Sequence, residues 1–186
     1  MRRILLLAFL CLFAVSFTGC KKARLRAQLK ELMGSTIVLP EKISCVYNGE
    51  VFPMPDSLRS KAKLIVYIDS SDCTGCRLSK LPQYATFAES LRSWNTSFFV
   101  LMSPQKGKKE DTIELILSYD YPFPVFLDDN RVYLDNNLQY TDMPSSLYTV
   151  LVDEDCRPVL IGDPLSSDAM YKLFFNRIQT IKNLLK

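Results

Sequence analysis

Two cysteines with two residues between them, Cys73 and Cys76, are the side chains of this sequence best suited to chemistry. Such a pair can exchange disulfides with a partner, supply two thiolates to a metal site, or form a structural disulfide. Cys73 lies between a predicted buried strand and a predicted helix, where unpaired N–H groups and the helix dipole favour a thiolate. We therefore expect Cys73 to be the nucleophile. Cys76, one turn further and less exposed, is the expected resolving thiol.

The other residue types of the chain narrow these alternatives. The 186 residues include no histidine, which excludes Ser-His-Asp and Cys-His catalysis and every zinc site built on imidazole. An all-thiolate metal site would also need Cys45 and Cys156, which do not form a second Cys-x-x-Cys pair. We therefore expect no metal and no cofactor. A purely structural Cys73–Cys76 disulfide would close a very short ring and stabilise the fold little. The sequence leaves open whether Cys45 and Cys156 pair.

The N-terminal residues 1–19 have the layout of a secretory signal peptide. Arg2 and Arg3 are followed by a mostly apolar run over residues 4–17 and then by small residues. This run is shorter than the roughly 20 apolar residues that a membrane-spanning helix needs. The mature protein is therefore expected outside the cytoplasm, where disulfides persist.

The four residues Phe-Thr-Gly-Cys at 17–20 resemble the lipobox of bacterial lipoproteins, with Phe17 in the place of the usual leucine. The resemblance implies cleavage before Cys20 and a lipid on Cys20. It predicts a lipid-anchored protein of the cell envelope whose domain faces the periplasm. The alternative is a secreted protein with a free Cys20. Residues 20–35 would hold the lipidated cysteine and a basic tether helix, which lies on an anionic lipid surface or packs on the domain.

The charge and length of the chain bound its other properties. Removing residues 1–19 takes away two of the 23 basic residues and none of the 20 acidic ones, so the remainder is nearly neutral. Nucleic acid is therefore not an expected partner, because phosphate binding requires a marked basic surplus. The length that remains is enough for one domain with a substantial core.

The pattern of apolar residues beyond position 36 predicts an α/β domain with a mixed sheet. Asn48-Gly49 suits a tight hairpin turn, and Pro82 should kink or interrupt the helix that contains it. A strand–helix–strand order implies parallel pairing with helices over the sheet, and the late hairpin adds antiparallel strands. In chain order we predict a hairpin at 43–55, a strand at 62–69, a helix at 76–94, a strand at 96–103, a helix at 108–120, a strand at 123–129, a loop at 134–145, a hairpin at 146–164 and a helix at 166–186.

The cysteine pair at a strand-to-helix step and the segment DMPSSLYTVLVD at 142–153 together resemble a known family. Residues 36–186 look like the thioredoxin fold, and within it the extracytoplasmic TlpA-like thiol-disulfide oxidoreductases. This implies a three-layer α/β/α domain with a central mixed sheet and an N-terminal β-hairpin. It also implies a cis-proline at Pro144, packed against the cysteine pair.

The resemblance further implies which residues meet a substrate. Cys73 and Cys76 would be catalytic, and the substrate chain would contact four residues: Thr74, Gly75, Met143 and Pro144. The partners would be protein disulfides or dithiols of the envelope and a membrane electron donor or acceptor.

Several positions depart from the family pattern. Asp72 replaces an aromatic residue, Thr74-Gly75 replaces Gly-Pro or Pro-Pro, and Tyr67 replaces a buried aspartate. Loss of that acid predicts slower exchange or a proton path through solvent. The alternative function is a non-catalytic thioredoxin-like lipoprotein that binds a protein partner.

Overall fold

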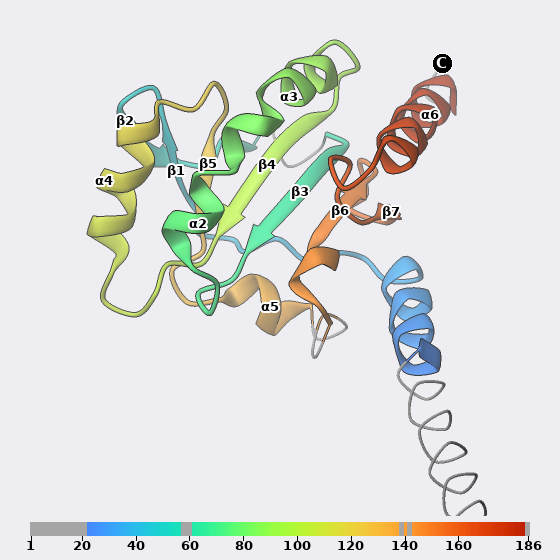
Figure 1. Cartoon of the computed structure of the whole chain (residues 1–186), viewed down its shortest axis with the longest axis horizontal. Helices are drawn as coiled ribbons and strands as arrows, with labels where there is room; N and C mark the ends of the chain where they lie inside the picture. The colour runs from blue at the N-terminus through green and yellow to red at the C-terminus, as the bar shows by residue number, and fades with distance from the viewer. Residues whose placement is uncertain (1–21, 57–60, 138–139, 141–142, 185–186) are drawn as a thin grey trace, which may run out of the picture.

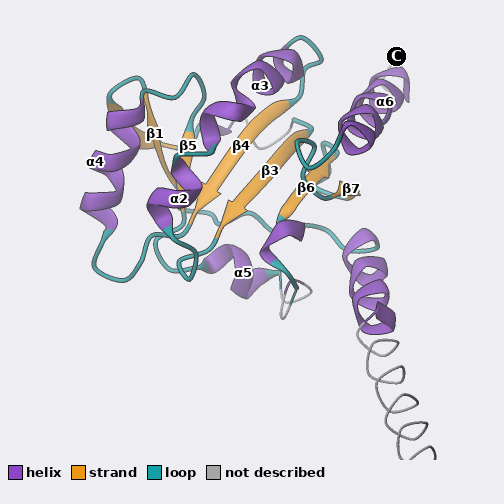
Figure 2. Ribbon diagram, in the orientation of Figure 1, coloured by secondary structure: helices purple, strands orange, loops and turns teal. Residues whose placement is uncertain are grey.

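A mixed β-sheet forms the centre of the computed structural model, which describes residues 22–56, 61–137, 140 and 143–184. Its seven strands have the order β2-β1-β5-β4-β3-β6-β7 (Figure 1). Helices, purple in Figure 2, flank the orange strands, and each face of the sheet has its own apolar core. The predicted α/β architecture with a central mixed sheet is confirmed.

Three parallel strands form the middle of the sheet: β3 (Lys63–Ile68), β4 (Ser97–Met102) and β5 (Val125–Leu127). All six residues of β3 are buried. A nearly unbroken apolar sequence is what a strand covered on both faces requires. Residues 64, 66 and 68 pack into one core, and residues 65 and 67 pack into the other.

Antiparallel hairpins extend the sheet at both edges. The first joins β1 (Ser44–Tyr47) to β2 (Glu50–Pro53) through Asn48 and Gly49, whose φ angles are 51° and 79°. Two consecutive positive φ angles are those of a type I′ turn, so the predicted hairpin is confirmed. β1 pairs with β5 in antiparallel orientation.

The second hairpin joins β6 (Thr149–Val152) to β7 (Pro158–Ile161), and β6 pairs antiparallel with β3. This confirms the predicted late hairpin. Cys156 lies in its turn, with a positive φ of 59°. Cys156 and Cys45, which lies in β1, are both free, so the pairing that the sequence left open does not occur in this structure.

One face of the sheet is covered by the helices that follow β3, β4 and β7 (Figure 1). The segment after β3 is broken, because α2 (Thr74–Leu78) is followed by a 3₁₀ turn, Leu81–Tyr84, and then by α3 (Ala85–Arg92). Pro82 lies in the 3₁₀ turn, as expected of a residue that cannot continue the backbone ladder. The other helices on this face are α4 (Lys109–Tyr119) and α6 (Asp168–Leu184).

The opposite face is covered by α5 (Val132–Asn136) and by a helix at residues 22–33. The sequence predicted only a loop at 134–145, and α5 corrects that prediction in part. Its first N–H groups, those of Val132 and Tyr133, donate to the buried Asp128 carboxylate at 2.9 and 2.8 Å. Five residues are too few for a recognisable apolar period, so the helix depends on this cap and on burial of Tyr133.

The helix at residues 22–33 packs on the domain. Leu32 is completely buried, and Leu25 and Leu29 lie against the same core. This favours the packed tether over the membrane-surface alternative. Cys20 and the predicted signal peptide lie outside the described residues. Among the helices that the structure describes, none is long and apolar enough to cross a membrane.

Gly162 directly follows β7 and lies beside Met170 of α6. Its φ is 124°, its N–H donates to the Thr149 carbonyl at 2.8 Å, and a Cβ here would lie 2.8 Å from Met170 Cε. The backbone conformation therefore requires glycine, whereas the flexible end of the Met170 side chain can move aside.

We expect Gly162→Ala to lower the free energy of unfolding by about 1–3 kcal/mol through backbone strain at its positive φ. Urea denaturation measures this loss. Gly34→Ala is the matched control, because a Cβ there meets its nearest atoms at an ordinary 3.6 Å. A Gly162→Ala midpoint equal to that of the wild type would contradict the assignment.

Cys45 is predicted to be unreactive in the folded protein. It is 1% exposed, and burial raises the pKa of its thiol to about 11. At pH 8 roughly one molecule in a thousand would then carry the thiolate. Iodoacetamide should label the partly exposed Cys156 first and Cys45 only after denaturant is added, as read by peptide mass spectrometry. Equal labelling of both in the native protein would refute this.

Candidate functional site

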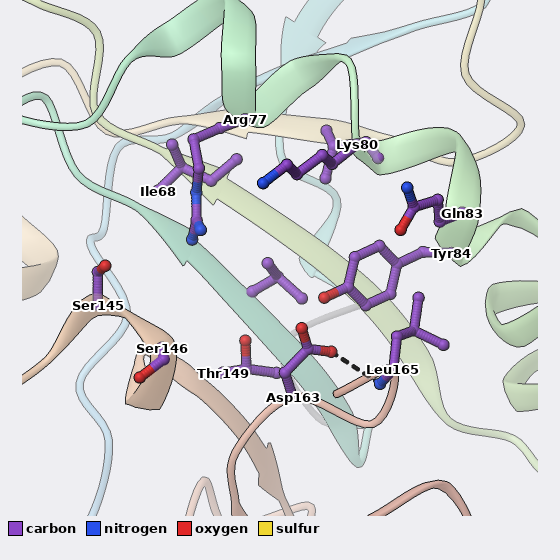
Figure 3. Close-up of a pocket in the computed structure, with 12 residues that line it drawn as sticks. Ile68, Arg77, Lys80, Gln83, Tyr84, Ser145, Ser146, Thr149, Asp163 and Leu165 are labelled. Carbon is purple, nitrogen blue, oxygen red and sulfur yellow. Dashed lines mark hydrogen bonds between the residues drawn. The ribbon is translucent and has the colours of Figure 1, made fainter. Parts of the chain in front are cut away.

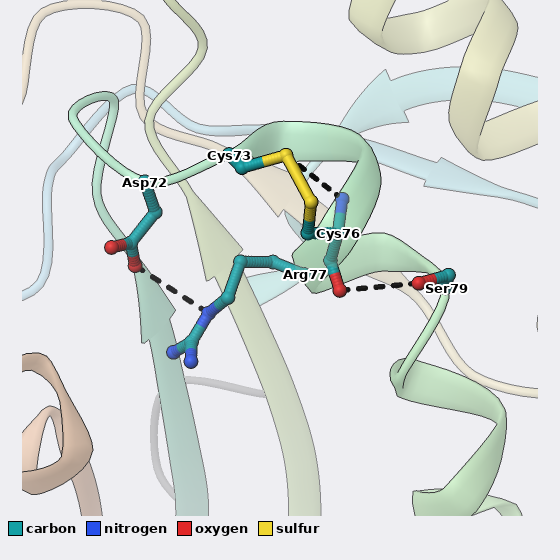
Figure 4. The surroundings of a disulfide bond; sticks show 5 residues. All are labelled: Asp72, Cys73, Cys76, Arg77 and Ser79. Carbon is teal, nitrogen blue, oxygen red and sulfur yellow. Dashed lines mark hydrogen bonds and ion pairs between the residues drawn. A yellow bond between two sulfur atoms is a disulfide. The ribbon is translucent and has the colours of Figure 1, made fainter.

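The cysteine pair lies where β3 gives way to α2. Cys73 caps α2, and its Sγ accepts a hydrogen bond from the Cys76 N–H at 3.4 Å. The two cysteines form a disulfide, with their Cα atoms 5.3 Å apart (Figure 4). Both residues are exposed, and the lower exposure expected for Cys76 stays a prediction. A partner sulfur can therefore reach this pair, and the Cys76 N–H would favour a Cys73 thiolate after reduction.

An ion pair lies beside the disulfide. Arg77 Nε is 3.4 Å from Asp72 Oδ2, and both side chains are partly exposed (Figure 4). Asp72 immediately precedes Cys73, so its negative charge would oppose a thiolate there. Arg77 offsets that charge. The sequence showed both residues but could not establish that they meet.

A second carboxylate, Asp69, lies at the start of the loop between β3 and Cys73. It directly follows β3, is 7% exposed, and lies 3.0 Å from Arg131 Nε. The sequence analysis did not single out either residue. The available signal was a carboxylate placed directly after a buried parallel strand, where functional groups collect in α/β sheets.

Tyr67 occupies the position at which the family resemblance implied a buried acid. Its ring is fully buried and stacks on Tyr133, with ring centroids 4.8 Å apart. Burial raises the pKa of Tyr67 far above its ordinary value, and the Asp128 and Asp69 carboxylates add to the effect. The hydroxyl therefore stays protonated near neutral pH and cannot replace a carboxylate as proton acceptor.

Pro144 differs from its expected geometry. The described residues contain no cis peptide bond, so the cis-proline prediction is wrong. Pro144 has φ −59° and ψ 138° and begins a 3₁₀ turn, Ser145–Leu147, that separates it from β6. Pro144 is exposed, whereas Met143 is 5% exposed and belongs to the core on the α5 face.

Thr74 and Gly75 form the first turn of α2 and are partly exposed. A Cβ at Gly75 would meet nothing within 4 Å, so a second chain has room to approach there. Substrate contact at Thr74, Gly75, Met143 and Pro144 stays a prediction.

A cavity of about 320 Å³ lies next to this site on the α2 face (Figure 3). Arg77, Lys80 and Tyr84 line it on one side, and Ser145 and Asp163 line it on the other. The sequence did not predict it, because its walls come from segments far apart in the chain.

In the described part of the chain, no three or more Cys, Asp or Glu side chains gather in a way that could hold a metal ion.

The sequence and the structure of the chain were compared with those of known proteins. No family model and no curated protein sequence matches the chain. Among solved structures, the thioredoxin domain of a thiol-disulfide oxidoreductase from Bacteroides vulgatus is 16% identical, with 77% of this chain and 98% of that chain covered and a TM-score of 0.52. A candidate thiol:disulfide interchange protein DsbE from Chlorobium tepidum is 13% identical over 77% and 98%, with a TM-score of 0.54.

A third similar structure is a candidate protein disulfide isomerase from Bacteroides thetaiotaomicron. It is 15% identical over 80% of this chain and 89% of that chain, with a TM-score of 0.54. Identities this low establish the architecture alone. The chain has the thioredoxin-like α/β fold, with a central mixed sheet and flanking helices.

Proposed function

We propose that this protein is a thiol-disulfide oxidoreductase that exchanges electrons with protein disulfides or dithiols through Cys73 and Cys76. The observation that carries the proposal is an exposed, disulfide-forming Cys-x-x-Cys pair at the strand-to-helix step of a thioredoxin-like fold. The names of the similar structures support the same chemistry.

In the reducing direction, the Cys73 thiolate attacks one sulfur of a partner disulfide. A Cys73–partner bond forms, and the partner's other sulfur leaves as a thiolate. The Cys76 thiolate then attacks Cys73 Sγ, which closes the Cys73–Cys76 disulfide and releases the second partner thiolate. The partner gains two electrons and this protein loses two. The reverse sequence oxidises a dithiol.

The proton of the resolving thiol needs an acceptor. Tyr67 stays protonated, and Asp69 is engaged by Arg131. Because Cys76 is exposed, we assign this proton to solvent.

We further propose that the protein acts at the cell envelope, anchored by a lipid on Cys20, with its domain in the periplasm. The support is the sequence pattern of residues 1–20. The helix at residues 22–33 would then hold the domain close to the membrane, because its Leu32 is packed into the core. Substrates would be envelope proteins, with a membrane electron donor or acceptor.

We expect the protein to accelerate the reduction of insulin by dithiothreitol and Cys73→Ser to abolish the acceleration, because the attacking sulfur is lost. Turbidity of the precipitating insulin B chain is the measurement. Cys156→Ser is the matched control and should retain the wild-type rate, because Cys156 lies in the β6–β7 turn and outside the pair. If the wild-type protein does not accelerate insulin reduction, the enzyme proposal is contradicted and the partner-binding alternative is favoured.

We also expect Cys76→Ser to accumulate a mixed disulfide between Cys73 and its substrate, because the resolving step is removed. Non-reducing gel electrophoresis and mass spectrometry of cells that express this variant would reveal the adduct. The adduct should disappear with dithiothreitol and be absent in the Cys73→Ser, Cys76→Ser double variant. Adducts of equal amount in the double variant would show that Cys73 is not the attacking residue.

A further inference from the structure

The Asp69 carboxylate is held at both oxygens by one arginine. Arg131 Nε lies 3.0 Å from Oδ1, and Arg131 Nη2 donates to Oδ2 at 3.3 Å. The Asp69 side chain is 8% exposed and that of Arg131 is 50% exposed. A two-point contact of this kind sets the orientation of the carboxylate as well as its position.

The residues between β3 and Cys73 wrap around this same carboxylate. Ser71 Oγ donates to Oδ2 at 2.7 Å, and Ser70 Oγ donates to Oδ1 at 3.3 Å. The Asp72 N–H donates to the Asp69 carbonyl at 2.9 Å, which closes a turn directly before Cys73. Asp69 therefore holds Ser70 and Ser71 through its carboxylate and Asp72 through its backbone carbonyl.

The backbone conformation of Arg131 is fixed by contacts of the β5–α5 connection. Its φ and ψ are 57° and 26°, a left-handed conformation that a non-glycine residue keeps only when its surroundings impose it. The surroundings are the β5–α5 connection. There Asp128 accepts the first two N–H groups of α5, and its own N–H donates to the Met102 carbonyl at 2.8 Å. The Arg131 side chain thus extends from the β5–α5 connection to Asp69, in the loop that leads to Cys73.

The charged groups of the segments next to Cys73 are arranged in pairs. Its own loop supplies Asp69 and Asp72, α2 supplies Arg77, and the β5–α5 connection supplies Arg131. The remaining groups of these elements are engaged elsewhere: Asp129 pairs with Lys109 at 2.6 Å, Asp128 caps α5, and Tyr67 of β3 is a buried neutral hydroxyl. Each carboxylate before Cys73 therefore has its own arginine.

We propose that the Asp69–Arg131 ion pair is a positioning device for Cys73, which holds the loop and cancels a carboxylate that would oppose the Cys73 thiolate. The inference rests on the proposed function only in taking Cys73 as the attacking sulfur. Asp69 and Arg131 act through the loop and touch no substrate.

The test uses the reduced full-length protein in the Cys76→Ser background, so that the peptide over residues 64–77 holds Cys73 alone. The rate of Cys73 alkylation by iodoacetamide is measured against pH by peptide mass spectrometry. Arg131→Gln exposes the Asp69 charge and should move the midpoint up by about half a pH unit. Asp69→Asn keeps an acceptor for the serines, leaves Arg131 unpaired, and should move the midpoint down by a similar amount. The double variant should lie near the parent.

Opposite shifts that cancel are a result that a merely structural role would not produce. Shifts of both single variants in the same direction, or none in either, would overturn the inference. Arg131→Lys keeps the charge and should shift the midpoint less than Arg131→Gln. If Arg131→Gln fails to fold, two results still test the inference: the midpoint should move down in Asp69→Asn and change little in Arg131→Lys. Arg157→Gln is the matched control, because it breaks an exposed pair with Asp155 in the distant β6–β7 turn and should leave the profile unchanged.

The inference and the proposed function fail separately. A parent protein that exchanges insulin disulfides while its variants show no opposed shifts would lose this inference alone. A protein that exchanges no disulfides would lose the proposed function, and the alkylation profile would still decide whether the ion pair acts on Cys73.

Discussion

The parallel pairing of β3, β4 and β5 is the constraint on which the site depends. Parallel strands end at the same edge of a sheet, and the register here aligns Ile68 with Met102 and Met102 with Leu127. The next residue of each strand therefore lies at one edge, and those residues are Asp69, Ser103 and Asp128. Asp69 begins the loop to Cys73, and Asp128 anchors the connection that carries Arg131. A single strand register thus brings together the loop that leads to the cysteine pair and the Asp69–Arg131 ion pair.

Burial on both faces gives that edge its rigidity and also limits its chemistry. The residues of β3 alternate between two cores, and the one nearest the edge on the α5 face is Tyr67, in stacking contact with Tyr133. A stacked aromatic ring stabilises this core by burying apolar area. The same ring places a hydroxyl with a strongly raised pKa where the thioredoxin resemblance implied a carboxylate. In the proposed exchange, proton transfer is therefore assigned to solvent at the exposed cysteines.

Local patterns predicted most of the elements, and tertiary contacts explain the exceptions. The Asn48-Gly49 turn, the apolar run of β3 and the break at Pro82 depend on neighbouring residues and are confirmed. The helix α5 was missed because its stability comes from the Asp128 carboxylate and from burial of Tyr133. The prediction of a cis peptide bond at Pro144 was wrong. It came from a resemblance in sequence, which did not reveal the 3₁₀ turn between this proline and β6.

The sequence by itself determined that a cysteine pair follows a buried strand and opens a helix, in a chain without histidine and with a mixed sheet. Only the tertiary structure decided what surrounds that pair. Arg131 reaches Asp69 across 62 positions of sequence, and the adjacent cavity is lined from several distant segments. Propensity and periodicity act between residues close in the chain, whereas these contacts depend on strand register and on the path of loops. Such contacts therefore become visible only when the sheet is assembled.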